Sequence, residues 1–136
     1  METYRGTVYP WHCDHMGHMN VMWYVGKFDE ATWQLFRVVG LTPAALRASG
    51  RGMAAVDQHI SYRRELLAGS TVSIESAVRE VHRKRIVFEH TMHDDESGDV
   101  AATTTLIGVH IDSRLRKSCE FPAEILEAAR RLIALP

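Results

Sequence analysis

The chain has 136 residues, of which 46% are apolar and 24% charged, and this composition predicts one globular domain spanning residues 1–136. Sixteen Lys and Arg against seventeen Asp and Glu give a net charge of -1, which excludes a globally basic nucleic-acid binder. No apolar run approaches the roughly 20 residues that cross a bilayer, and the first residues lack the basic-then-apolar order of a secretory signal. We therefore expect a cytoplasmic protein that binds neither nucleic acid nor membranes.

The first 40 residues predict a strand, a loop and a long helix. Alternating residues over Thr3–Tyr9, followed by a proline, indicate a short strand, and residues 11–20 indicate a loop. From Val21 to Val39, large apolar residues recur at three- and four-residue steps, with Asn20 as a plausible N-cap and Gly40 as a stop. Apolar residues occupy most of this helix's circumference, so we expect other structure to enclose it.

The rest of the chain predicts mainly antiparallel strands. A short helix follows Thr42-Pro43 and ends at Ser49-Gly50. Four segments rich in Val, Ile, Thr or Phe then predict strands over residues 53–66, 70–82, 85–93 and 100–111. Short turns between successive strands imply antiparallel neighbours. With a final helix from Pro122 to about Ile133, this order predicts an α+β domain.

The loop from Trp11 to Asn20 is the densest collection of reactive groups in the chain, and it leads directly into the long helix. The first N–H groups of a helix have no partner within it and lie at the positive end of its dipole, so they can hold an anion or a developing oxyanion. Asp14, folded back beside the Val21 N–H, would supply a base or nucleophile together with an oxyanion hole, which is the minimum for acyl transfer. The alternative is that Asp14 only caps a turn or the helix.

The same loop contains four competent zinc ligands, which are His12, Cys13, His15 and His18. Their spacing is poor, and no second pair elsewhere completes a set of four. We therefore expect no metal. The distant cysteines, Cys13 and Cys119, are expected to be ordinary reduced thiols.

Aromatic and methionine side chains are concentrated in the loop and the long helix. They are typical of core and dimer packing, but they are also typical of an acyl pocket with aromatic walls that is able to receive a cation over an indole face. The group consists of Trp11, Met16, Met19, Met22, Trp23, Tyr24 and Trp33.

The pattern D-x-x-G-H-x-N-x-x-x-Y begins at Asp14 and is followed by D-E-A at residues 29–31. It resembles the signature of hotdog-fold acyl-CoA thioesterases, and most of all that of the 4-hydroxybenzoyl-CoA thioesterase-like branch. Residues 80–88 and 98–105 also resemble that family, so the likeness covers nearly the whole chain. The resemblance implies a hotdog fold, in which one long central helix is wrapped by a curved antiparallel β-sheet, and it implies hydrolysis of an acyl-CoA thioester to a free acid and coenzyme A.

The resemblance also implies roles for individual residues. Asp14 would be the catalytic carboxylate, acting as a nucleophile or as a general base on water, and the backbone N–H of Val21 would polarise the thioester carbonyl. His18 and Asn20 match the motif and would shape the loop or touch the thioester. The family's basic turn, which meets the phosphates of coenzyme A, is matched by Arg83, Lys84 and Arg85.

Several expectations about partners and alternatives accompany this assignment. Coenzyme A is part of the substrate, and no separate cofactor is required. Family members are dimers or tetramers with sites at the subunit interface, so a homodimer or homotetramer is expected. Glu30 lies where a second branch of the superfamily carries its catalytic Glu, although Asp14 is the better match. Acyl-ACP hydrolysis and a non-catalytic acyl-CoA-binding module remain as alternatives.

Overall fold

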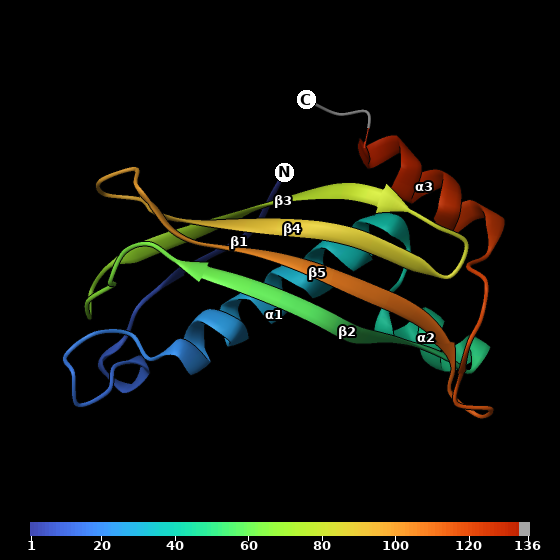
Figure 1. Cartoon of the computed structure of the whole chain (residues 1–136), viewed down its shortest axis with the longest axis horizontal. Helices are drawn as coiled ribbons and strands as arrows, with labels where there is room; N and C mark the ends of the chain where they lie inside the picture. The colour runs from blue at the N-terminus through green and yellow to red at the C-terminus, as the bar shows by residue number, and fades with distance from the viewer. Residues whose placement is uncertain (134–136) are drawn as a thin grey trace. The chain divides into compact units, whose positions relative to one another are not determined.

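The predicted α+β architecture is present in the structure, a computed structural model that describes residues 1–133 (Figure 1). Three α-helices accompany the strands of the described chain, and a 3-10 turn, η1 (Pro10–His12), precedes the first of them. The helices are α1 (Val21–Val39), α2 (Pro43–Ser49) and α3 (Ala123–Ile133). The strands are β1 (Glu2–Thr7), β2 (Arg51–Tyr62), β3 (Thr71–Val81), β4 (Arg85–Asp94), β5 (Val100–Asp112) and β6 (Lys117–Ser118).

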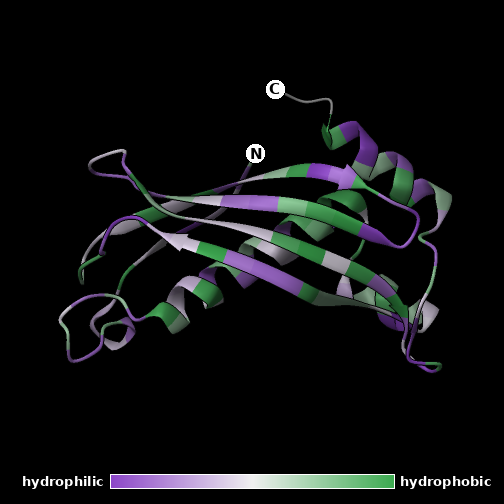
Figure 2. Cartoon of the chain, viewed as in Figure 1, coloured by the Kyte–Doolittle hydropathy of each residue, from purple (hydrophilic) through white to green (hydrophobic). Residues whose placement is uncertain are grey.

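All the strands hydrogen-bond into one sheet with the order β1-β3-β4-β5-β2, and β6 pairs with β5. The pairing of β1 with β3 is antiparallel, as is that of β5 with β6. Buried and less buried positions alternate along β3, β4 and β5, and Figure 2 shows the matching alternation of hydrophobic and hydrophilic residues along the strands.

The observed boundaries agree with the sequence except at a few places. α1 has the predicted bounds, whereas β2 begins two residues early and ends at Tyr62, so residues 63–66 are not strand. The N–H groups of Arg63 and Arg64 both donate to the carbonyl of Ala101, which ends the regular ladder there. The two-residue β6 and the turn η1 were not predicted.

Tertiary contacts divide the chain into two compact units, each with its own apolar core. The first unit comprises residues 1–34, 60–76 and 90–104. The second comprises residues 35–59, 77–89 and the described residues from 105 onward. The organisation as a single domain stays a prediction, and its last three residues, 134–136, lie outside the described residues.

In the first unit, the buried side of α1 packs on the sheet. Tyr24, Phe28 and Ala31 recur at three- and four-residue steps and join a core with residues of β3, β4 and β5. Part of this core is polar, because the imidazole of His90 on β4 is fully buried and lies 5.9 Å from the Phe28 ring.

In the second unit, the continuation of α1 packs on β4 through apolar groups. The rings of Phe36 and Phe88 meet edge to face at 5.4 Å, and the buried Ile125 belongs to the same cluster. Gly108 of β5 faces the two rings, and a Cβ atom there would lie 3.4 Å from Phe88 and 3.5 Å from Phe36. These two distances are ordinary van der Waals contacts, and the tighter contact of such a Cβ would be with Cε of the Met53 side chain at 3.3 Å.

The expectation that α1 is enclosed on most of its circumference is wrong for this chain. All of its buried residues lie on one stripe, and several large apolar side chains on the remaining surface are exposed. The exposed fraction is 61% for Met22, 40% for Val25 and 37% for Trp33. No helix among residues 1–133 is long and apolar enough to cross a membrane.

Candidate active site

The loop before α1 is held in a tight turn by its own backbone. The N–H of Asp14 donates to the carbonyl of His18 at 3.1 Å, and the N–H of Gly17 donates to the carbonyl of Asp14 at 3.0 Å. Gly17 has a φ of +86°, a conformation that side chains disfavour. The buried Met19 anchors the end of the loop, because its N–H donates to the Leu66 carbonyl at 2.7 Å. The glycine of the sequence motif thus lets the loop fold back.

The Asp14 carboxylate has two donors from within this loop. Oδ1 accepts from the Met16 N–H at 2.9 Å, and Oδ2 accepts from Nδ2 of Asn20 at 2.8 Å. The hydrogen bonds from Asn20 and Met16 hold the pKa of the exposed carboxyl below its usual value. Asp14 is therefore an anion at neutral pH.

Asn20 connects this carboxylate to the start of α1. Its Oδ1 accepts from the Met22 N–H at 2.9 Å, as an N-cap does, while its Nδ2 donates to Asp14. Its backbone N–H donates to the His12 carbonyl at 2.9 Å. Among residues 1–133, no acceptor hydrogen-bonds to the Val21 N–H, so this first-turn donor is available to a ligand.

The imidazole of His18 lies beside the site, and within the described chain it forms no hydrogen bond with the Asp14 carboxylate. Its Nδ1 is 3.5 Å from the Met19 carbonyl oxygen, and its Nε2 is 3.6 Å from Oε1 of Glu65. His18 does not form a metal site with the loop's other histidines and Cys13. Within residues 1–133, no group of three or more His, Cys, Asp or Glu is placed to hold a metal ion.

The basic turn predicted to contact phosphates belongs to the second unit. Its backbone is fixed, since the carbonyls of Arg83, Lys84 and Arg85 each accept a backbone hydrogen bond. The Arg83 guanidinium lies 3.1 Å from Glu120, and both of these side chains are exposed. Within the described chain, Lys84 and Arg85 form no ion pair. Their charges therefore remain available to a phosphate.

A pocket of about 600 Å³ in the first unit adjoins the loop. Tyr9, Trp11 and Trp23 give it aromatic walls, and Lys27 and Glu30 add charges. Of the aromatic and methionine group singled out from the sequence, Met19 and Tyr24 are instead core residues. Sequence reasoning missed Lys27, although a lysine within the apolar stripe of a helix was a visible signal.

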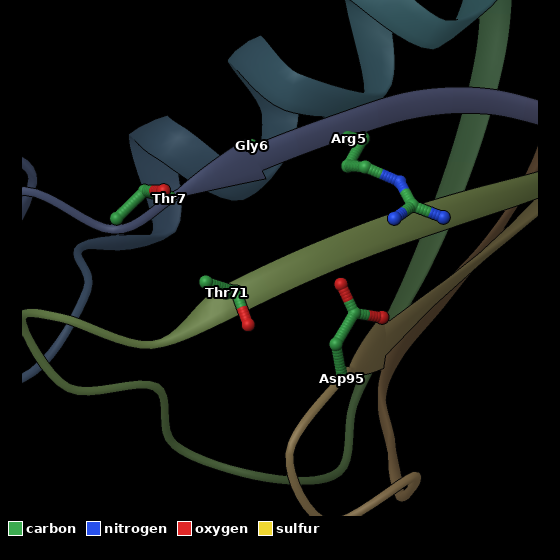
Figure 3. A pocket seen from close by; sticks show the side chains of 5 residues that line it. All are labelled: Arg5, Gly6, Thr7, Thr71 and Asp95. Atoms are coloured by element: carbon green, nitrogen blue, oxygen red, sulfur yellow. The ribbon is translucent and has the colours of Figure 1, made fainter.

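A second pocket, of about 670 Å³, lies where β1 approaches the start of β3 (Figure 3). The guanidinium of Arg5 and the carboxylate of Asp95 point toward one another across it. Both groups have other partners, because Nε of Arg5 donates to Glu2 at 2.7 Å and Oδ1 of Asp95 accepts from Ser73 at 2.6 Å. The Arg5 charge is thus paired with that of Glu2, whereas the partner of Asp95 is a neutral hydroxyl.

Comparisons with known proteins identify the family. Residues 8–129 match the thioesterase-like superfamily. The L-carnitine dehydrogenase/betainyl-CoA thioesterase of Rhizobium meliloti is 32% identical over 113 residues, which cover 83% of this chain and 23% of that protein. This chain thus spans about a quarter of that relative's length. The betainyl-CoA thioesterase of Pseudomonas aeruginosa is 26% identical over 132 residues, which cover 97% of this chain and 83% of that protein.

Solved structures support the same fold. A protein of Staphylococcus aureus, determined in complex with CoA, superposes with a TM-score of 0.92 and covers 98% of this chain and 84% of its own. The two sequences are 20% identical, so this likeness concerns the fold alone. The chain therefore belongs to the thioesterase-like superfamily and has the hotdog fold that the sequence predicted.

Proposed function

We propose that this chain is an acyl-CoA thioesterase, which hydrolyses a thioester to a free acid and coenzyme A. The observation that carries the proposal is the Asn20 side chain, which caps α1 and at the same time donates a hydrogen bond to Asp14. This arrangement holds a carboxylate beside the first turn of a helix, where the Val21 N–H is an available donor.

Two routes through Asp14 give the same products. As a general base, the carboxylate takes a proton from water while the water oxygen attacks the thioester carbonyl, and the C–S bond then breaks. As a nucleophile, the carboxylate attacks the carbonyl, expels the thiolate and forms an anhydride that water hydrolyses. In both routes the Val21 N–H would stabilise the oxyanion, and the thiolate leaves as a weakly basic group.

The remaining roles follow from the same proposal. Asn20 orients Asp14, and His18 shapes the loop. The side chains of Arg83, Lys84 and Arg85 would bind the phosphates of coenzyme A, as their charge and exposure allow. This chemistry requires no metal or redox cofactor. The cytoplasmic location stays a prediction.

Replacing Asp14 with Asn tests the assignment. We expect kcat to fall by at least about a hundredfold, the lower range for an acid-base group, with the fold intact by circular dichroism. Glu127→Gln, which neutralises an exposed acid of α3, serves as the control, and Glu30→Gln tests the acid that a second branch of the superfamily would use. Near-normal turnover by Asp14→Asn would overturn the role of this carboxylate.

Thiol release from a panel of thioester substrates distinguishes acyl-CoA hydrolysis from acyl-ACP hydrolysis and from acyl-CoA binding without catalysis. The panel contains short, branched, aromatic, long-chain and betainyl thioesters of coenzyme A, the last because two relatives are named for it. A matched ACP thioester that is hydrolysed faster would indicate a protein carrier. Binding of coenzyme A thioesters without thiol release would indicate a non-catalytic module. In a single turnover in H₂¹⁸O, an acid product without ¹⁸O would demonstrate the anhydride route, because an Asp14 oxygen enters the product only when water attacks an anhydride at the Asp14 carbon.

We also propose that the protein is a homodimer or homotetramer with shared sites. β2 is at the end of the strand order, and its central residues, among them Val56, are exposed. An edge strand of this length is normally covered in soluble proteins, and pairing with a second copy would cover it. Sedimentation at micromolar concentration should therefore give a dimer or larger assembly. A fully active monomer would contradict both the interface and any sharing of sites.

A further inference from the structure

The pocket that adjoins the Asp14 loop contains a buried lysine. Lys27 lies on α1, its side chain is almost fully buried, and it lines the pocket together with aromatic rings. Lysine is rarely buried unless its charge has a partner, because removing an ammonium from water is costly. No carboxylate within the described residues lies within 4 Å of its Nζ.

The ammonium of Lys27 has fewer acceptors than donors. Nζ donates to the Tyr4 hydroxyl at 2.8 Å and to the Thr7 carbonyl at a longer 3.4 Å. It also lies 5.2 Å from the centroid of the Tyr4 ring. An ammonium has three N–H donors, so one remains for a ligand in the pocket.

The location of the pocket indicates which part of an acyl-CoA it would receive. Its wall residue His12 accepts a hydrogen bond from the Asn20 backbone, and Asn20 contacts Asp14. A thioester carbonyl at the α1 N-terminus would thus place its acyl chain next to the pocket. The phosphates of coenzyme A are separated from the thioester by the long pantetheine arm, so they are poor candidates for this position.

The charges in the pocket discriminate between acyl groups. Aromatic walls suit either a quaternary ammonium or an apolar chain. However, the Lys27 ammonium already occupies the cation position near the Tyr4 ring, and a second cation would be repelled. Glu30 offers a compensating carboxylate, but it is exposed and therefore screened by solvent, whereas Lys27 is buried.

We propose that this pocket receives the acyl chain and that Lys27 selects chains whose far end carries a carboxylate. The inference rests on the proposed thioesterase function for its kinetic consequences. The free N–H of Lys27 donates to the carboxylate, while Trp11 and Trp23 cover the methylene groups. Trp11 is 67% exposed, so an acyl chain would also cover apolar surface that is otherwise in water.

The test compares adipyl-CoA with hexanoyl-CoA, which has the same chain length without the carboxylate, and with betainyl-CoA. For the parent protein we expect kcat/KM to be at least about tenfold higher for adipyl-CoA, as a charged hydrogen bond provides. Lys27→Met should abolish this preference. Lys117→Met, which removes an exposed lysine of β6, should retain it.

The same ratio for the parent and Lys27→Met, or a preference for betainyl-CoA, would overturn the proposal. Binding of thioether analogues, in which CH₂ replaces the thioester carbonyl, tests the carboxylate preference of the pocket independently of the thioesterase function. Tighter binding of the carboxylated thioether by the parent supports the pocket even if no thioester is hydrolysed. Equal binding of the carboxylated thioether and its uncharged counterpart would reject the proposed role of the pocket, even if thioesters are hydrolysed. This comparison needs only the parent protein, so it remains decisive if Lys27→Met does not fold.

Discussion

The two units of the chain differ in what they bury. Among residues 1–133, the first unit buries seven polar or charged side chains and the second buries one, His110. The core of the second unit is otherwise formed by aliphatic and aromatic groups. The seven of the first unit are Thr3, His12, Lys27, Thr32, Ser76, His90 and Thr104.

This difference indicates that the buried groups of the second unit mainly stabilise the fold, whereas those of the first unit also position the loop that contains Asp14. Apolar burial stabilises the second unit without requiring specific partners, whereas every buried polar group of the first unit needs a hydrogen bond to offset its lost hydration. His12 supports the Asp14 loop in this way, because its carbonyl accepts from Asn20 and its Nδ1 accepts from the Tyr9 N–H at 3.0 Å. The first unit is therefore the one more sensitive to pH and to polar substitutions.

The largest effect is expected from acid, acting through His90. Its Nε2 lies 2.8 Å from the Thr32 hydroxyl, and its Nδ1 lies 2.6 Å from the Ser76 hydroxyl. Burial lowers the pKa of His90 from 6.5 to about 4, so the unfolded chain binds the proton first. The contribution is complete above pH 6.5 and is lost as the pH falls from 6.5 to 4. We expect the free energy of unfolding to decrease by about 3 kcal/mol over that range.

Urea unfolding at several pH values measures this effect. His90→Gln should reduce the slope between pH 6.5 and pH 4, whereas His59→Gln, which replaces an exposed histidine, should not. Some slope will remain, because burial also lowers the pKa values of His12 and His110. An unchanged slope in His90→Gln would show that the polar core of the first unit does not cause its acid sensitivity.

A smaller effect is expected where the second unit takes part in function, at the basic turn. Replacing Arg83 and Lys84 with Ala should raise KM for coenzyme A thioesters by about tenfold and leave kcat nearly unchanged, because phosphates are bound equally in the ground and transition states. Added salt should weaken binding by the parent protein more than by this variant. Replacing Arg114 and Lys117, two exposed cations elsewhere in the unit, provides the charge-matched control. Equal KM values in the variant and the parent would leave the turn without a role in binding.

The sequence predicted features set by local rules. The bounds of α1 follow from apolar spacing, the Asn20 cap and the Gly40 stop. Features that depend on distant contacts were not predictable. The end of β2 depends on Ala101, and the role of Lys27 depends on Tyr4, which lies on another element. Local patterns specify elements, whereas partners distant in sequence determine where a strand ends and what a buried charge contacts.

The smallest expected effect compares the two helix caps. Thr42 caps α2 in the second unit, where its Oγ1 accepts from the Ala45 N–H at 3.1 Å, and Asn20 caps α1 in the first. Either cap replaced by Ala should lower the free energy of unfolding by about 1 kcal/mol. Only Asn20→Ala should also lower kcat, because only Asn20 donates to Asp14. Asn20→Asp retains a cap acceptor but replaces the donor with a second carboxylate, so its stability should stay near that of the parent while its kcat falls. Parallel losses of stability and kcat in all three variants would mean that the Asn20–Asp14 contact only supports the fold.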